Sequence, residues 1–222
     1  ELPELLKISV YGLPEIYREK IRDAVLVANP GCYPTCSILG IAPLLVNKLI
    51  DTKSIIIDAV SGISGAGRKA DIMYQFCESA ENFKAYNVAT HRHTSEIEQE
   101  LSYLANEEIT VSFTPHLAPI KRGMLATIYA NLKEDAGTAE IISRYNEFYR
   151  GENFVRVMDE GKFPETKYVA GSNFIDIGIA VDKRTRRVII LSAIDNLGKG
   201  ASGQAVQDLN LMCGYPEHTA LI

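Results

Sequence analysis

The sequence predicts an α/β fold of the α+β type, in which helices cover one side of a mixed, largely antiparallel sheet. Segments that are typical of strands follow one another in the middle and at the end of the chain, without regular helical crossovers between them. Apolar residues at helical spacing mark other segments that can cover such a sheet. Because parallel neighbours need long crossovers, this order favours a sheet that is mixed or largely antiparallel.

The individual elements follow from hydrophobic spacing and from Pro and Gly positions. We expect helices at 15–23, 35–49, 96–105 and 138–149, and a last helix that ends at Met212. We expect strands at 24–29, 54–60, 109–115 and 124–132, and a hairpin of 173–181 with 187–193. Pro43 predicts a kink in its helix, and Thr94 or Ser95 is the expected N-cap of the helix at 96–105.

Composition excludes several classes of protein. The 222 residues are 46% hydrophobic and 23% charged, which is ordinary for a globular chain and enough for a core without disulfides or metal. The net charge of −5 carries no basic run, so nucleic acid is not an expected partner. No apolar stretch reaches the ~18 residues of a membrane helix, and no secretory signal is visible.

Four cysteines are too few for a disulfide scaffold, and they form no CxxC pair that would indicate zinc. We therefore expect a reducing, cytoplasmic location and no metal. Cys36, Cys77 and Cys213 lie in apolar or helical runs and are interpreted as buried structural cysteines.

Cys32 stands out because it lies in the segment Asn29–Thr35, NPGCYPT. A strand is expected to run into a tight turn here, with Cys32 at its apex and a helix beginning within three residues. Free backbone N–H groups and the positive end of the helix dipole would favour the thiolate, which is the nucleophile. The same N–H groups would hold an oxyanion when a carbonyl is attacked.

A histidine pair offers the acid–base partner that a cysteine nucleophile needs. His91 and His93 flank Arg92 on one short segment just before an expected helix. Cysteine plus histidine is the minimal pair for acyl transfer, although a solvated loop remains the alternative. No further motif at metal-ligand spacing accompanies the two imidazoles.

Two glycine-rich loops each follow an expected strand. The segment 198–203 matches G-x-G-x-x-G, but only 19 residues follow it, and none of them forms the second strand of a dinucleotide-binding unit. Its position before a helix still allows contact with an anion or with a cofactor edge. The segment 61–68, SGISGAGR, suits a phosphate or a nicotinamide carboxamide, or is only a flexible turn.

Five sequence blocks, in order along nearly the whole chain, carry a family resemblance. They are NPGCYPT, SGISGAGR, HRHTSEIEQEL, FTPHLAPIKRGMLATIY and DNLGKGASGQAVQDLNLM. Together they resemble the N-acetyl-gamma-glutamyl-phosphate reductases, the arginine-biosynthesis members of the aspartate-semialdehyde dehydrogenase superfamily.

The resemblance implies a two-domain enzyme that is a homodimer or homotetramer. An N-terminal Rossmann domain would bind NADP(H), and a second domain would carry the cysteine and the oligomer interface. Residues 1–29 would be the tail end of the cofactor-binding domain, 30–194 the catalytic, substrate and dimerisation domain, and 195–222 a C-terminal loop and helix returning toward the cofactor domain. Only 31 residues precede Cys32 and they hold no Gly-rich fingerprint, so we expect that the Rossmann domain is missing here and that this chain alone is inactive as a reductase.

The resemblance also implies roles for residues in the matching blocks. Cys32 would attack the acyl phosphate of N-acetyl-glutamyl 5-phosphate, and NADPH would reduce the thioester to the semialdehyde. His91 would be the acid–base group, with His93 as the alternative. The residues expected to bind substrate are Tyr86, Arg92, His93, Glu96 and Arg122. Those expected beside the cofactor are Ser61, Gly62, Ser64, Gly65, Asn196, Lys199 and Gly200.

Three alternatives remain open on sequence alone. One is a cofactor-independent cysteine acyl-transferase or amidase, and another is a non-catalytic dimerisation domain. The third is a related reductase whose aminoadipyl or glutamyl phosphate substrate is linked to a carrier protein. Such an enzyme should show a basic docking rim, which the acidic balance of this chain disfavours.

Overall fold

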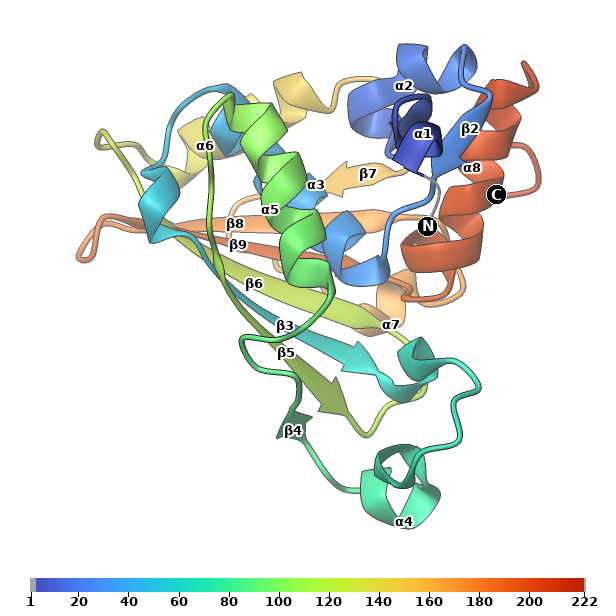
Figure 1. Cartoon of the computed structure of the whole chain (residues 1–222). Coiled ribbons are helices and arrows are strands. Elements are labelled where there is room, and N and C mark those ends of the chain that lie inside the picture. The colour runs from blue at the N-terminus through green and yellow to red at the C-terminus, as the bar shows by residue number, and fades with distance from the viewer. Residues whose placement is uncertain (1–2, 222) are drawn as a thin grey trace.

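A seven-stranded sheet forms the centre of the protein, whose computed structural model describes residues 3–221 (Figure 1). Its strand order is β4-β5-β3-β6-β9-β8-β7. The strands are β3 (Ile56–Gly62), β4 (Lys84–Ala85), β5 (Ser112–Ala118), β6 (Met124–Asn131), β7 (Val155–Val157), β8 (Ile175–Asp182) and β9 (Arg187–Ile194). Within this seven-stranded sheet, only the pairs β3–β5 and β7–β8 are parallel. The prediction of a mixed, largely antiparallel sheet is therefore confirmed.

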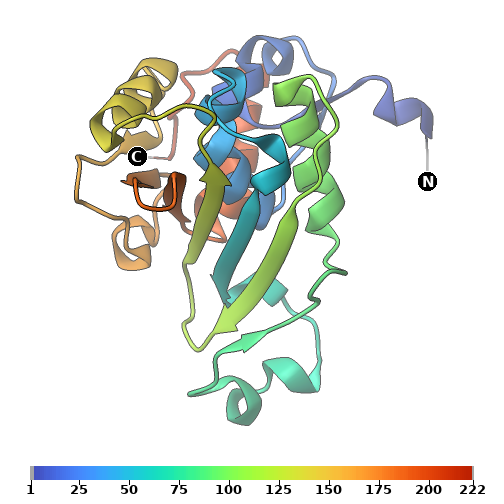
Figure 2. The ribbon, with the colours of Figure 1, turned by 90° about the vertical axis from the view of Figure 1, so that its left-hand side faces the viewer.

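Two long helices cover one face of this sheet. Helix α3 (Cys32–Val46) packs against β6 and β9, and α5 (His93–Ala105) lies beside it (Figure 2). Helix α6 (Thr138–Phe148) contacts α3 and β8. Along β6, every second residue is buried beneath the helices and the residues between are only partly buried. This alternation is typical of a strand with one covered face.

Helix α3 is apolar on all sides and runs on for three residues beyond Pro43. A proline inside a helix has no N–H for the carbonyl four residues earlier, here that of Leu39. The hydroxyl of Tyr149, which follows α6, donates to the Leu39 carbonyl at 2.5 Å. Tyr145 of α6 likewise donates to the next carbonyl, Gly40, at 2.7 Å. The two tyrosines thus supply donors where proline weakens the helix.

The N-terminal part forms a small βαβ unit apart from the main sheet. Strand β1 (Ser9–Tyr11) pairs parallel with β2 (Leu26–Ala28), and α2 (Pro14–Arg22) connects them. The C-terminal helix α8 (Gly203–Met212) packs against α2, and a π-helical turn, η4 (Gly198–Ser202), leads into it (Figure 1). The remaining short helices are α1 (Pro3–Leu6), η1 (Thr52–Ser54), η2 (Ile63–Ala66), η3 (Ile72–Tyr74), α4 (Phe76–Ser79) and α7 (Thr166–Val169).

Two local predictions are wrong. Helix α5 begins at His93, ahead of both Thr94 and Ser95, so neither is its N-cap. Instead, the ring nitrogen Nδ1 of His91 accepts the backbone N–H of His93 at 3.1 Å, which satisfies one of the free donors at the helix start.

The second correction concerns the cysteines. Cys36 is buried as expected, but Cys77 and Cys213 are exposed. Cys77 lies in α4, which has only four residues, and Cys213 comes directly after α8, so neither position is covered by a neighbouring element. None of the helices within residues 3–221 has both the length and the hydrophobicity that a membrane span requires.

Candidate active site

Cys32 is the first residue of α3 and is partly buried. Of the backbone N–H groups at this helix start, that of Gly31 is bonded to the carboxylate of Glu96, and Pro34 has none. The N–H of Thr35 already donates to the Gly31 carbonyl. The N–H groups of Cys32 and Tyr33 are left, and both interact with the Cys32 sulfur. They are the two donors that an oxyanion on an attacked carbonyl would meet.

The resting state of Cys32 differs from the sequence-based expectation. Burial raises the pKa of Cys32 to about 11, and the nearby charge of Glu96 acts in the same direction. The two backbone N–H groups and the Arg92 guanidinium oppose the rise without overcoming it. The helix start therefore favours the thiolate as predicted, but burial outweighs it and the resting group is a thiol. A base must take this proton before Cys32 can attack.

His91 and His93 are buried side by side next to this cysteine turn. Their ring centroids are 4.9 Å apart, and the ring of Tyr33 contacts both edge-on. The Nε2 atom of His93 lies 2.5 Å from the point that a Cβ on Gly31 would occupy, so only glycine fits before Cys32. Burial lowers the pKa of His91, and it lowers the pKa of His93 to about 4, helped by the charges of His91 and Arg92. Both imidazoles are therefore neutral at pH 7 and able to accept a proton.

Three of the residues expected to bind substrate surround this pair. Tyr86 contacts the His91 ring, and its hydroxyl donates to the Tyr33 hydroxyl at 3.2 Å. Glu96 accepts the Gly31 N–H at 2.9 Å and the Tyr11 hydroxyl at 2.8 Å with the same oxygen. Arg92 is exposed. The structure thus brings all three to the cysteine, with Tyr86 and Glu96 already bonded inside the protein.

The two glycine loops contact each other, and one of them also contacts Cys32. A Cβ on Gly200 would lie 2.8 Å from the Cβ of Cys32, so the C-terminal loop touches the cysteine directly. The side-chain amide of Asn196 joins this loop to the other, because its Nδ2 donates to Ser64 Oγ at 3.0 Å and its Oδ1 accepts the Gly123 N–H at 2.8 Å. Gly65 lies over Ser61, with a Cβ position 2.9 Å from Ser61 Oγ.

Arg122 lies next to the same loops. The turn that contains it packs against Gly62, where a Cβ would lie 2.9 Å from the carbonyl oxygens of Ile120 and Lys121. The half-exposed guanidinium faces Asp195 at 3.4 Å. Burial alone would raise the pKa of Asp195, but three backbone N–H donors and Arg122 hold it below its usual value. Asp195 therefore stays charged and fixes both the arginine and the start of the C-terminal loop.

Lys199 faces away from this site. Its ammonium is fully buried and donates to Glu15 Oε1 at 2.5 Å and to Gln207 Oε1 at 2.6 Å. In η4 the backbone of Gly200 faces Cys32, whereas the side chain of Lys199 reaches α2. The ion pair gives Lys199 a structural role. Because the ammonium is buried against α2, this geometry does not support the expected contact of Lys199 with a cofactor.

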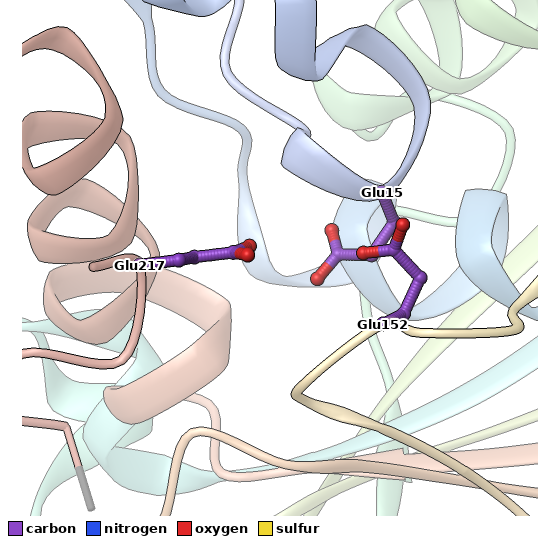
Figure 3. Close-up of side chains that lie close together, drawn as sticks. All are labelled: Glu15, Glu152 and Glu217. Atoms are coloured by element: carbon purple, nitrogen blue, oxygen red, sulfur yellow. The ribbon is translucent and has the colours of Figure 1, made fainter. Parts of the chain in front are cut away.

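Glu15, Glu152 and Glu217 form an acidic cluster around this lysine, with carboxylate oxygens within 4.8 Å of one another (Figure 3). Arg18 bridges Glu152 and Glu217, and Lys199 pairs with Glu15. Burial raises the pKa of Glu152 to about 7 in spite of Arg18. Because cations of the chain already balance the cluster, we interpret it as a structural joint between α2 and the C-terminal residues.

Sequence reasoning missed three residues of the site. Tyr33 packs against both histidines and Phe113, and its position directly after the cysteine was the available signal. Asp195 and Tyr11 had no such signal, because they act on Arg122 and Glu96, which are distant in sequence.

A mixed sheet of the α/β class thus carries a cysteine at a helix start, with neutral imidazoles nearby and two N–H donors at its sulfur. These are the groups that covalent acyl transfer requires. The match to a known family is specific. Residues 32–196 match the family model described as semialdehyde dehydrogenase, dimerisation domain. The chain belongs to this family.

Curated relatives align with almost the whole chain. It is 70% identical over 220 residues to the N-acetyl-gamma-glutamyl-phosphate reductase of Acetivibrio thermocellus, covering 99% of this chain and 64% of that protein. It is 62% identical to the protein of the same name from Desulforamulus reducens, covering 98% of this chain and 63% of the relative. The resemblance found in the sequence blocks is thereby confirmed. The chain spans somewhat less than two thirds of the length of these relatives.

Solved structures show the same fold at low identity. Aspartate semialdehyde dehydrogenase II of Vibrio cholerae superposes with a TM-score of 0.73 at 17% identity, covering 94% of this chain and 69% of that one. The aspartate semialdehyde dehydrogenase of Francisella tularensis gives a TM-score of 0.73 at 17% identity, covering 93% and 71%.

Proposed function

We propose that this chain is the catalytic part of an NADP(H)-dependent N-acetyl-gamma-glutamyl-phosphate reductase of arginine biosynthesis. The observation that carries the proposal is the placement of Cys32 at the start of α3, with His93 against Gly31 on one side and Gly200 on the other. The names of the relatives supply the substrate, and the site supplies the chemistry that such a substrate needs.

Acylation is the first step of the proposed reaction. A neutral imidazole takes the proton of Cys32, and the sulfur attacks the acyl carbon of N-acetyl-glutamyl 5-phosphate. The carbon–sulfur bond forms as the carbon–oxygen bond to phosphate breaks, so inorganic phosphate leaves and a thioester remains. The N–H groups of Cys32 and Tyr33 hold the oxyanion. Arg92 and Arg122 are the proposed cations for the substrate's phosphate and carboxylate.

Reduction follows on the same cysteine. NADPH, when bound, supplies the hydride that the thioester carbon accepts. The protonated imidazole returns its proton to the oxygen of the resulting thiohemiacetal. The imidazole then takes the proton back from the oxygen as the carbon–sulfur bond breaks, and it passes this proton to the leaving sulfur. The semialdehyde leaves, and the Cys32 thiol is restored.

His93 is the stronger candidate for the acid–base group, although His91 was the first choice from the sequence. The ring of His93 lies against Gly31, the neighbour of Cys32, and its Nδ1 atom is buried with no partner within residues 3–221. His91 uses its Nδ1 to hold the start of α5. We propose that His93 transfers the proton to and from the reacting groups, and that His91 orients His93.

The proposed nicotinamide position lies between the two glycine loops. Ser61, Gly62, Ser64 and Gly65 lie on one loop, and Gly200, which touches Cys32, lies on the other. The Asn196–Ser64 hydrogen bond joins the two loops, and this arrangement suits a flat ring held by backbone groups. Asn196 contributes by joining the loops, since both ends of its amide are bonded within the protein. Lys199 does not contribute to the proposed nicotinamide position, because its ammonium is bonded to Glu15 and Gln207.

We propose domain boundaries on the basis of the small β1–β2 sheet. A two-stranded sheet is too small to be stable alone, and parallel pairs such as β1–β2 normally belong to larger α/β sheets. This suits residues 1–29 as the end of a cofactor-binding domain, with the catalytic domain at 30–194 and a C-terminal return at 195–222. We also propose the cytoplasm as its location, because all four cysteines are free.

A coupled assay tests this function. The chain, joined to the N-terminal cofactor domain of a relative, is mixed with NADPH and N-acetyl-glutamyl 5-phosphate. Phosphate release should match the loss of nicotinamide absorbance, and Cys32→Ser should abolish both. Phosphate release without oxidation of NADPH would instead support a cofactor-independent acyl-transferase.

A further inference from the structure

Tyr11 of β1 reaches the cysteine turn through Glu96 of α5. Its hydroxyl donates to Glu96 Oε1 at 2.8 Å, and the same oxygen accepts the backbone N–H of Gly31 at 2.9 Å. We propose that Tyr11 is a positioning residue, whose hydroxyl holds Glu96 on the Gly31 N–H and so fixes the turn that carries Cys32. The inference rests on the proposed function only in assigning the nucleophile to Cys32.

Helix α3 depends on this contact because its own first turn cannot supply it. In a capping box, a glutamate at the third helical position accepts the N–H of the N-cap residue. In α3 that position is Pro34, and the N-cap Gly31 has no side chain to form a cap. Glu96 provides the missing carboxylate from a different helix. Tyr11 then determines where that carboxylate lies.

The turn has little room to move without disturbing its neighbours. The His93 ring lies within 3.0 Å of the Cβ position of Gly31, and the Cβ position of Gly200 lies 2.8 Å from the Cβ of Cys32. His93 and Glu96 share the first turn of α5, so a shift of Glu96 relative to Gly31 changes how the imidazole faces the cysteine. The Tyr11 hydroxyl therefore acts on the site although it does not touch it.

The charges around Cys32 also support a positioning role for Tyr11. The titratable groups near the cysteine turn are His91 and Arg92 just before α5, His93 and Glu96 in its first turn, and the hydroxyls of Tyr33 and Tyr86. Among these, Arg92 favours the thiolate and Glu96 opposes it. Burial and the Glu96 charge raise the pKa of Tyr11 far above its usual value, so its hydroxyl keeps donating throughout the pH range in which Cys32 titrates. Loss of that donor leaves the Glu96 charge less compensated.

The chain contains a matched control. The Tyr17 hydroxyl donates to Glu100 Oε2 at 2.7 Å, one helical turn farther along α5, and the rings of Tyr11 and Tyr17 pack edge-on. Tyr17→Phe removes the same kind of hydrogen bond from the same helix. It does not involve Gly31.

The test is alkylation of Cys32 by iodoacetamide, followed by peptide mass spectrometry between about pH 7 and 10. It needs neither acyl phosphate nor NADPH, so its failure is separate from failure of the proposed reductase. Tyr11→Phe should slow alkylation of Cys32 by about tenfold and move its profile to higher pH, as expected for losing a hydrogen bond to a charged group. Tyr17→Phe should leave the rate and the profile unchanged. Equal profiles for the two variants would overturn the proposal.

The other cysteines serve as internal references. Exposed Cys77 and Cys213 should react alike in every variant, and labelling of buried Cys36 would reveal unfolding. If Tyr11→Phe unfolds, Glu96→Gln decides the matter, because its amide keeps an acceptor for the Gly31 N–H and removes the charge. Its Cys32 profile should move to lower pH, and an unmoved profile would reject the proposal.

Discussion

His93 is held neutral beside the proposed nucleophile, and this placement lowers the free energy of unfolding at acidic pH. Its pKa falls from 6.5 to about 4 on folding because of burial and the neighbouring positive charges. As the pH drops below 6.5, His93 binds a proton in the unfolded chain but stays neutral in the folded protein. The free energy of unfolding therefore falls until about pH 4. At about 1.4 kcal/mol for each pKa unit, the loss from this buried group is on the order of 3 kcal/mol.

We therefore expect His93→Asn to flatten the decline in stability between pH 6.5 and 4 by roughly this amount. Urea unfolding at several pH values measures it, with His218→Asn at an exposed position as the control. An unchanged pH dependence in His93→Asn would show that His93 is not held neutral by the fold.

The residues that sequence reasoning found at the site share short segments. Cys32 lies in a turn motif and His91 and His93 in one tripeptide, so local chemistry was enough to select them. The Tyr11–Glu96 and Arg122–Asp195 contacts join residues 85 and 73 positions apart, which no local pattern reveals. Burial of Cys32 was equally invisible, and it reversed the expected resting state of the thiol.

Helix α3 carries the cysteine, and Tyr149, directly after α6, compensates for the backbone N–H that Pro43 lacks. Tyr149→Phe should lower the free energy of unfolding by about 1–2 kcal/mol, because the buried Leu39 carbonyl loses its donor. In a Pro43→Ala background the same change should cost less, since the alanine supplies a backbone N–H to that carbonyl. A double-mutant cycle by urea unfolding measures the coupling. Additive effects would mean that the hydroxyl does not replace the missing N–H.

Elements were predictable where the hydrophobic period was clear, as for β6 with its alternating burial and for the hairpin β8–β9. The start of α5 was misplaced because its first N–H is held by the ring of His91, and no ordinary capping residue marks it. The order of the strands in the sheet could not be predicted from the sequence either. The parallel pairing of β3 with β5 depends on how α5 crosses between them.

At the scale of the whole molecule, the sheet face opposite α3 and α5 is only partly buried. On it lie Ile56 and Val60 of β3, Leu125 and Tyr129 of β6, and Ile189 and Leu191 of β9. Asp58 and Thr127 lie on the same face between these side chains. A largely apolar sheet face of this kind suits an interface, and the family model describes a dimerisation domain. We propose that this face pairs two copies of the chain.

Leu125→Arg should then convert the dimer to a monomer in sedimentation velocity, because a charge would be buried without a partner. Val46→Arg, at an exposed position on the helical side, should leave the dimer intact. Identical sedimentation of Leu125→Arg and the unmodified protein would place the interface elsewhere.

We propose that Cys32 is the residue that becomes acylated. The direct measurement is mass spectrometry of the chain after brief incubation with N-acetyl-glutamyl 5-phosphate and rapid acid quenching. We expect one N-acetylglutamyl group, removable by hydroxylamine, on the peptide that contains Cys32, and none on this peptide in Cys32→Ser. Release of phosphate with the acyl group on another residue, or on none, would contradict the account.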